Sequence, residues 1–381
     1  MRRLVTAAAL GLVSIAALTG WYIARKLTEP QSARSFSVRI HGTETSGNRT
    51  LVTLDRTRQT TSRGTFSLIL ESGALVRLGP DLIDHGTHVS RAVLVDSRDE
   101  LHAGQRASWS GIYYSSPADA ALEATDVAVP TAAGISPAWL IEARAPDTDA
   151  WAIHIHGLGS NRAAMLRGAQ VAADAGLTSL IVTYRNDGEG PPTTPHRSTL
   201  GVTETDDVET ALQYAVDHGA KRVVIFGWSM GAAIALRLAS SPQWASHVVG
   251  LILNSPVLDW ATTLRANCIR AGAPASLAIL ALPWLTSRQL ARATGLSEPV
   301  PLREFNWLTR ANELAVPVLL LHGTQDTSTP FTASATLARL RPDLVTLVPF
   351  AADHAMEWNV DPERWRRSVK NWLESQLDRK G

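Results

Sequence analysis

The sequence predicts an α/β protein with a mostly parallel central sheet and helices on both faces, preceded by a small β-rich module and a transmembrane helix. Three observations predict this. From residue 122 onwards, short apolar strand patterns alternate with helical periodicity, whereas between residues 35 and 118 apolar and polar residues alternate at a period of two, and residues 4–24 carry no charge. Alternating strands and helices are typical of a parallel sheet covered on both faces, and a period of two is typical of half-buried strands.

The composition excludes several classes of protein. The chain has 381 residues, 45% hydrophobic and 19% charged, which is enough for one large domain and a smaller one. Its 36 basic and 35 acidic residues give a formal net charge of +1, so we expect no nucleic-acid partner. The single cysteine, Cys268, excludes an internal disulfide and a multi-cysteine metal site.

Residues 1–34 are predicted to be a transmembrane anchor and linker. At about 1.5 Å per residue, an uncharged helix over residues 4–24 is long enough to cross a hydrocarbon layer of about 30 Å. Trp21 and Tyr22, followed by the basic pair 25–26, are typical of the membrane interface. A cleaved signal peptide is the alternative, but bulky residues interrupt its cleavage pattern. We expect a single-pass membrane protein with its body outside the cytoplasm.

Residues 35–118 are predicted to form a β-rich accessory module. Runs such as 37–40 and 65–70 alternate apolar and polar side chains and are separated by Gly, Asn, Ser and Asp. No chemistry is assigned to this module. A small, polar stretch follows it, and the boundary is placed near Ala118, so that residues 119–381 form the second domain.

The second domain begins a regular succession of strands and helices. The predicted helices cover residues 161–175, 203–218 and 231–240. The predicted strands cover residues 151–156, 178–184, 222–226, 248–253, 316–321 and 344–349. Ligands of such sheets gather at the carboxyl ends of the strands. Each of the motifs below follows one of these strands.

The nucleophile candidate is Ser229. Residues 227–231 read GWSMG and lie between the strand 222–226 and the helix 231–240, which is the strand–turn–helix context that a G-x-S-x-G motif requires. Gly227 and Gly231 leave room where a β-carbon would collide with neighbouring elements. We therefore expect the Ser229 hydroxyl to stand exposed at the start of a helix.

Asp326 and His354 are the candidates for a proton relay. A serine hydroxyl needs a histidine base, and that base needs a carboxylate to orient it. Asp326 follows the strand 316–321 and His354 follows the strand 344–349, so both lie at strand ends. Asp353 is a rival for the acid, but a carboxylate next to the base in sequence rarely folds back onto its ring. His322 is expected to shape the loop.

These motifs give the chain a resemblance to a known superfamily. HGLG at residues 156–159, GWSMG at 227–231, HGTQD at 322–326 and DH at 353–354 occur in the superfamily's order. From about residue 122 to the C-terminus the sequence resembles the serine α/β-hydrolases, most like membrane-anchored bacterial members near the prolyl-oligopeptidase-like and dienelactone-hydrolase-like branches. The resemblance implies the α/β-hydrolase fold and does not extend over residues 35–118.

The resemblance also implies an oxyanion hole and a cap. One backbone donor would be the N–H of Met230, and the other that of Leu158, with Gly157 as second choice. The cap would be the insertion at about residues 259–312, which is rich in Leu and Trp. Its apolar residues fit either a pocket for acyl or aromatic groups or the cap's own core.

The expected activity is therefore hydrolysis of small carboxylic esters by Ser229, His354 and Asp326, with no metal or organic cofactor. An acyltransferase would use the same triad with an acceptor other than water. A serine peptidase or amidase of the prolyl-oligopeptidase type is the alternative, although residues 35–118 are too few for the propeller of the large peptidases. A membrane-tethered binding protein without catalysis is the alternative from another class.

Overall fold

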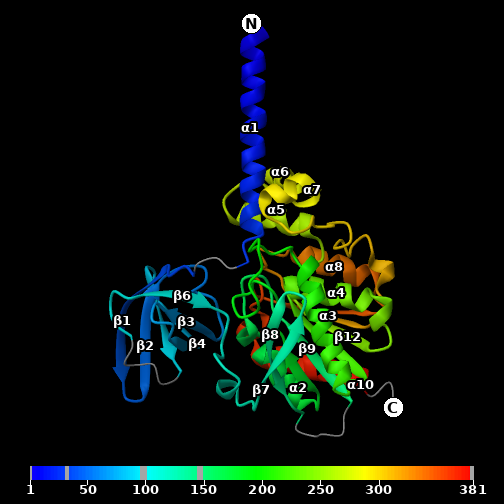
Figure 1. Cartoon of the computed structure of the whole chain (residues 1–381). Helices are drawn as coiled ribbons and strands as arrows, with labels where there is room; N and C mark the ends of the chain where they lie inside the picture. Colours follow the sequence, from blue (N-terminus) through cyan, green and yellow to red (C-terminus); the bar gives the residue numbers. More distant parts are fainter. Residues whose placement is uncertain (1, 31–33, 95–100, 144–148, 378–381) are drawn as a thin grey trace.

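The computed structural model describes residues 2–30, 34–94, 101–143 and 149–377, with side chains from Ser14 onwards. It has a small lobe and a large lobe that lie side by side, with one long helix standing on the large lobe (Figure 1).

The small lobe is a closed antiparallel barrel with strand order β1-β2-β5-β4-β3-β6. The strands are β1 (Val38–Ser46), β2 (Arg49–Asp55), β3 (Phe66–Leu70), β4 (Leu75–Asp84), β5 (His88–Val93) and β6 (Arg106–Ser110). Alternate side chains of β2 are buried, because one face of each strand turns into the barrel. The barrel closes where Val38 pairs with Ala107, at opposite ends of the module. The sequence predicts the β-rich character but not this closure.

The large lobe contains an eight-stranded sheet with strand order β14-β13-β12-β11-β9-β10-β8-β7. Its strands are β7 (Thr125–Thr131), β8 (Gly134–Ile141), β9 (Ala150–Ile155), β10 (Thr178–Ile181), β11 (Arg222–Trp228), β12 (Val248–Asn254), β13 (Val318–Gly323) and β14 (Val345–Phe350). The β7–β8 and β8–β10 pairs are antiparallel and the other pairs are parallel. The mostly parallel α/β sheet is thus confirmed, whereas the strands β7 and β8 at one end of it were not predicted.

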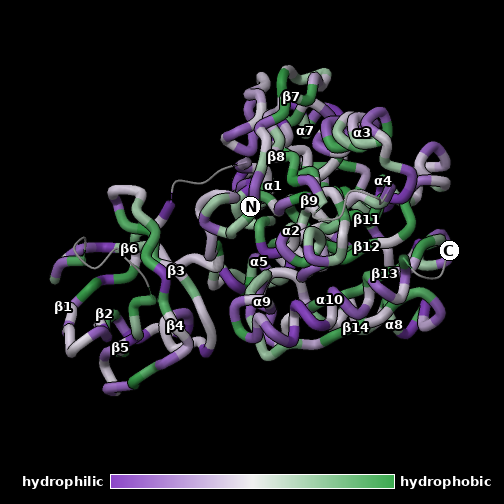
Figure 2. The backbone as a smooth tube through the Cα atoms, turned by 90° about the horizontal axis from the view of Figure 1, so that it is seen from below, coloured by the Kyte–Doolittle hydropathy of each residue, from purple (hydrophilic) through white to green (hydrophobic). Residues whose placement is uncertain are grey.

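Helices cover both faces of this sheet. Ile153 and Ile225 pack into the hydrophobic cluster that includes residues of α3 (Val202–Asp217), α4 (Met230–Ser240) and α8 (Phe331–Leu340). The neighbouring Ala152 and Phe226 pack into a second cluster with α2 (Leu166–Asp174) and α10 (Pro362–Leu377). Successive strand residues point to opposite faces, so the central strands must be apolar throughout. Figure 2 shows these hydrophobic segments in the middle of the large lobe.

The long helix α1 (Arg2–Leu27) stands on a cap formed by α5 (Trp260–Arg270), α6 (Ala278–Thr286) and α7 (Arg288–Thr294) (Figure 1). The Trp21 indole donates to the Ala293 carbonyl at 3.1 Å, the Arg25 guanidinium donates to Thr294 O at 3.0 Å, and Ala24 is fully buried. The last turns of α1 are therefore part of the packed body.

This packing bears on the predicted transmembrane helix. Among the residues that the structure describes, no helix is long and apolar enough to cross a membrane. Residues 4–13 of the predicted span have side chains outside the described part. Trp21 and Arg25, which the sequence places at a membrane interface, instead make their hydrogen bonds to the cap.

One buried base of the central sheet gives a prediction about stability. His154 of β9 is fully buried, its Nε2 lies 3.0 Å from Ser179 Oγ, and burial lowers its pKa from 6.5 to about 3. Between these two pH values the unfolded chain binds a proton that the folded chain does not, so stability falls as the pH is lowered, by up to about 1.4 kcal/mol per pH unit. We expect the unfolding free energy, measured with urea, to fall less between pH 6.5 and 4 in His154→Gln than in the wild type. An equal fall in the two proteins would contradict this.

Candidate active site

Ser229 stands at the junction between β11 and α4, with a left-handed φ of 53°. Two glycines make this turn sterically accessible. A β-carbon on Gly227 would lie 2.6 Å from Ala232 Cα, and one on Gly231 would overlap the Ile155 carbonyl. A non-glycine residue at positive φ is strained and persists only where the surroundings hold it. The side chain is partly exposed, as a reacting group must be.

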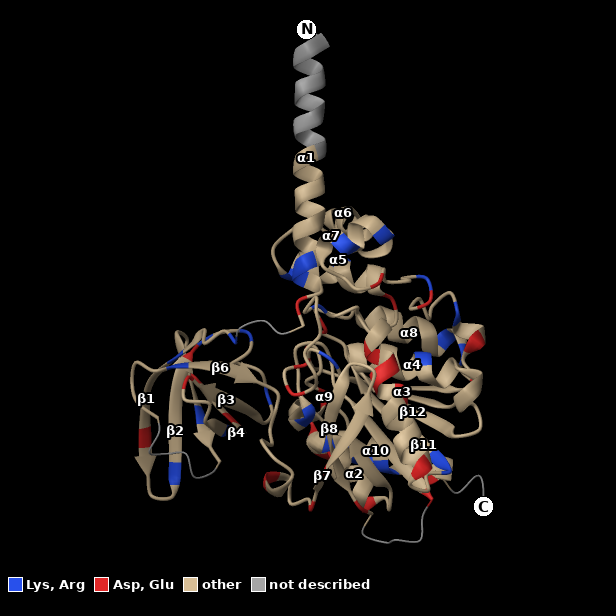
Figure 3. Cartoon of the chain, viewed as in Figure 1, with Lys and Arg blue, Asp and Glu red and all other residues tan. Residues whose placement is uncertain are grey.

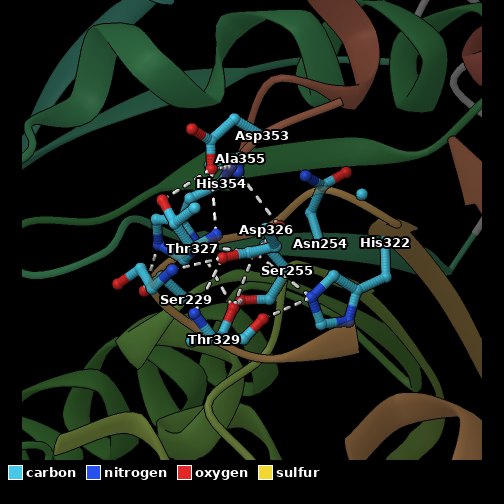
Figure 4. Close-up of polar contacts among 12 residues, drawn as sticks. Ser229, Asn254, Ser255, His322, Asp326, Thr327, Thr329, Asp353, His354 and Ala355 are labelled. Carbon is cyan, nitrogen blue, oxygen red and sulfur yellow. Dashed lines mark hydrogen bonds and ion pairs between the residues drawn. The ribbon is translucent and has the colours of Figure 1, made fainter. Parts of the chain in front are cut away.

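The structure brings the three predicted side chains into one hydrogen-bonded chain (Figure 4). His354 Nε2 lies 3.0 Å from Ser229 Oγ, and His354 Nδ1 lies 2.8 Å from Asp326 Oδ2. Ser229 follows β11, Asp326 follows β13 and His354 follows β14, so all three lie at carboxyl ends of strands. This is the arrangement by which a histidine removes a proton from a serine while a carboxylate holds its ring.

Asp326 is held in its ionised form. Burial opposes ionisation, but hydrogen bonds with His322 and His354 outweigh it, so the pKa of Asp326 lies well below its usual range. The backbone N–H groups of Ser328 and Thr329 each donate to Asp326 Oδ1 at 2.8 Å. The carboxylate is thereby fixed with its other oxygen toward the base.

The rival acid Asp353 has different partners. Its Oδ1 accepts from the N–H of Thr327 at 3.0 Å and from the N–H of His354 at 2.8 Å, and its Oδ2 lies 3.5 Å from the Arg58 guanidinium. Among the described contacts, none joins this carboxylate to the imidazole of His354. The geometry therefore favours Asp326 as the orienting acid.

Ser255 and Glu357 support the site and were missed by the sequence analysis. The Ser255 hydroxyl accepts from the N–H of Ala355 at 3.0 Å and lies 2.8 Å from Asp326 Oδ2 and 2.6 Å from Glu357 Oε1. Glu357 is fully buried, which raises its pKa, and it also accepts from the N–H of Gly323 at 2.8 Å. Neither residue belongs to a short motif, so no local signal marks them.

We expect Ser255→Ala to lower kcat by roughly tenfold, because its hydroxyl ties the Asp326 carboxylate to the loop that carries His354 and its loss leaves buried acceptors unpaired. Steady-state kinetics on a neutral ester measures this loss, and urea unfolding of Ser255→Ala at the same pH is the control for its fold. An unchanged kcat in a folded Ser255→Ala protein would contradict a role of the hydroxyl.

The predicted oxyanion loop after β9 lies against the nucleophile. A β-carbon on Gly157 would come within 3.0 Å of Ser229 Cβ. The Gly157 carbonyl accepts from the Tyr184 hydroxyl at 3.1 Å, and in the same peptide unit the N–H of Leu158 points the opposite way. Tyr184 is in turn fixed by Asp187, which accepts from the Tyr184 N–H at 2.9 Å and from His156 Nε2 at 3.0 Å. Met230 begins α4, so its N–H has no partner within that helix.

Most of the cap's large apolar residues pack into the core of the large lobe. Trp260, Leu264, Leu285 and Trp307 are all buried in the hydrophobic cluster of the large lobe. A cavity of about 630 Å³ instead opens beside His354, between the large lobe and the barrel. Among the described residues, no group of three or more His, Cys, Asp or Glu could hold a metal ion.

The comparisons with known proteins agree with this fold. Residues 152–368 match the Alpha/beta hydrolase family, and residues 39–110 match a domain of unknown function, DUF8805. No curated protein matches the chain. The esterase Pf2001 of Pyrococcus furiosus is 22% identical with a TM-score of 0.53, over 68% of this chain and 96% of that one. A putative aryl esterase of Burkholderia cenocepacia is 20% identical with a TM-score of 0.47, over 67% of this chain and 100% of that one. Because the family match spans more than half of the sequence, this protein belongs to the alpha/beta hydrolase family.

Proposed function

We propose that this protein is a serine hydrolase that cleaves carboxylic esters through an acyl-enzyme. The observation that carries the proposal is the continuous chain from Ser229 Oγ through His354 to Asp326, with distances of 3.0 and 2.8 Å. A serine hydroxyl is a weak nucleophile at neutral pH, and an oriented histidine is the group that activates it.

In the proposed reaction, Ser229 Oγ attacks the ester carbonyl carbon while His354 Nε2 takes its proton. The N–H groups of Leu158 and Met230 would stabilise the negative carbonyl oxygen of the tetrahedral intermediate. When the intermediate collapses, His354 returns the proton to the departing alcohol oxygen and the acyl group stays on Ser229. Water then attacks the acyl-enzyme with His354 again as base, and the acid leaves. Asp326 stabilises the imidazolium in both halves.

Hydrolysis of 4-nitrophenyl esters from acetate to palmitate, beside the matching 4-nitroanilides, tests the proposed function. We expect Ser229-dependent ester cleavage. The dependence of kcat/KM on acyl-chain length will show how long an acyl chain the pocket accepts. Ser229-dependent cleavage of the anilides at a measurable rate would instead favour the peptidase or amidase alternative. The peptidases that share this core filter their substrates with a propeller, whereas here a six-stranded barrel precedes the large lobe.

We also propose that α1 tethers the protein to a membrane. Residues 4–24 carry no charged side chain, and in the described part of α1, Ile15, Leu18 and Tyr22 are 63%, 65% and 59% exposed. Figure 3 shows no Lys, Arg, Asp or Glu on the described part of α1 until its end at the cap. Burying these apolar side chains in lipid would remove them from water.

A double substitution tests this tether. Ile15→Lys with Leu18→Lys places two charges in the proposed span. Inserting each charge into the membrane costs about 2.5–3.5 kcal/mol. We therefore expect the protein to move from the carbonate-washed membrane pellet to the supernatant. Ile135→Lys with Leu340→Lys, at positions 60% and 47% exposed outside α1, is the matched control and should stay in the pellet. Wild-type protein found wholly in the supernatant would refute the tether.

A further inference from the structure

The barrel is fixed against the loop that carries His354. The chain between β2 and β3 reaches α9 (Glu357–Val360), where Thr65 N–H donates to the Asn359 carbonyl and the Asn359 amide donates to the Thr65 carbonyl, both at 2.8 Å. Gly64, at a φ of 116°, packs so closely that a β-carbon would overlap Asn359 O. Figures 2 and 3 both place α9 on the side of the large lobe that faces the barrel. The barrel therefore adjoins the proposed active site.

Arg91 holds the shape of this β2–β3 loop from inside the barrel. It is fully buried on β5, and its guanidinium donates to the carbonyls of Thr60, Ser62 and Gly64 at 3.1, 2.6 and 2.6 Å, and to Gly79 O at 2.9 Å. Burial lowers its pKa to about 10, so it stays charged at neutral pH. Four carbonyl bonds to one buried cation fix the loop in one conformation.

This loop presents arginines to the cavity beside His354. The cavity of about 630 Å³ is lined by Arg58 and Arg63 from the β2–β3 loop, by Arg270 from the cap and by His354 itself. Among the described lining residues Asp353 is the one acidic side chain, and its carboxylate lies 3.5 Å from the Arg58 guanidinium. Arg63 and Arg270 are exposed and form no ion pair or side-chain hydrogen bond with another described residue. Two guanidinium groups that line the same cavity as the base thus have no partner among the described contacts.

The rest of the lining is apolar. Phe66 and Trp109 from the barrel and Met356 and Val360 from the large lobe also line the cavity. Its volume lies in the range of small-molecule sites, which combine an apolar body with a few polar groups that orient the ligand. An organic anion combines an apolar body with a charged group, and this lining combines apolar side chains with guanidinium groups.

We infer that the barrel supplies one wall of the substrate site, and that the substrate is an ester carrying an anionic group, a carboxylate or a phosphate, bound by Arg63 and Arg270. This inference rests on the proposed serine hydrolase function. Guanidinium groups recognise the oxygens of both anions in bidentate fashion, and a cleft with excess positive charge raises the local concentration of an anionic substrate.

The test compares two esters that differ only at the far end of a six-carbon acyl chain: mono-4-nitrophenyl adipate, which ends in a carboxylate, and 4-nitrophenyl hexanoate, which ends in a methyl group. In the full-length protein we expect the adipate to have the higher kcat/KM. In Arg63→Gln with Arg270→Gln we expect the ratio of the two values to fall by about tenfold, through the KM of the adipate. Arg106→Gln with Arg339→Gln removes the same charge at exposed positions away from the cavity and should leave the ratio unchanged.

The outcomes separate this inference from the proposed function. Two results would overturn the inference while Ser229-dependent hydrolysis stands. In the first, 4-nitrophenyl hexanoate is cleaved as well as the adipate ester. In the second, the preference for the adipate ester survives in Arg63→Gln with Arg270→Gln. If neither ester is cleaved and Ser229 does not react with a fluorophosphonate, both fail. Hexanoate and hexyl phosphate, tested as inhibitors beside neutral hexanamide, distinguish the two anions, and inhibition by hexanamide as strong as by either anion would also count against the inference.

Discussion

We expect Ser229→Ala to lower kcat for 4-nitrophenyl butyrate by about 10⁴- to 10⁶-fold, because the nucleophile and its base act as a unit and removing either abolishes the covalent route. Ser229 Oγ lies 3.0 Å from His354 Nε2. Among the described contacts, no other hydroxyl bonds to that nitrogen. Initial rates, corrected for spontaneous hydrolysis, measure the loss.

The control for this substitution is Ser240→Ala, at the far end of the same helix, where the hydroxyl bonds to the Arg237 carbonyl. It should change kcat less than twofold and keep fluorophosphonate labelling, which Ser229→Ala should lose. The full-length protein is the right material, because Ala24 is buried and Trp21 and Arg25 bond to the cap, so removal of α1 would disturb the cap. Labelling of another serine in the Ser229→Ala protein would identify a different nucleophile.

The parts of the site that could be predicted from the sequence are those that carry a local signal. The turn at Ser229 needs glycines at two fixed positions, and Asp326 and His354 follow strands whose apolar runs are unmistakable. Since carboxyl ends of parallel strands meet at one edge of the sheet, order along the chain was enough to expect proximity. The barrel closure and the strands β7 and β8 at one end of the sheet depend on pairing between distant or weakly apolar segments, which a local pattern does not encode.

The supporting residues could not be predicted for the same reason. Glu357 reads as a surface acid at the start of a helix, yet it is fully buried and accepts from the N–H of Gly323. Arg91 reads as one basic residue in an alternating strand, yet its guanidinium occupies the interior of the barrel. Each role depends on partners distant in sequence. The cap's leucines and tryptophans were recognised in the sequence, but their role was not. Their apolar character fits a substrate pocket or a core equally well, and only the observed packing distinguishes the two roles.

The second large effect is expected for Asp326→Asn, which should lower kcat by about 10⁴-fold. The carboxylate accepts from His354 Nδ1 at 2.8 Å, which leaves Nε2 free to accept the serine proton. An asparagine amide that donates at this position would favour the opposite tautomer, and it carries no charge to stabilise the imidazolium. Its remaining oxygen can still accept from the N–H groups of Ser328 and Thr329, so the loop should keep its shape.

Two comparisons show whether this loss is chemical. Asp353→Asn should lower kcat by less than about tenfold, because the Asp353 carboxylate contacts Thr327 and Arg58. A loss of kcat equal to that of Asp326→Asn would show that the orienting acid was assigned wrongly. The second comparison is stability. The lowered pKa of Asp326 means that its ionised form stabilises the fold above the usual pKa of 3.8, and this contribution is lost as the pH falls below that value. The wild type should therefore exceed Asp326→Asn in unfolding free energy by more at pH 7 than at pH 3. A variant that is folded at pH 7 yet inactive separates the chemical role of the carboxylate from its structural one.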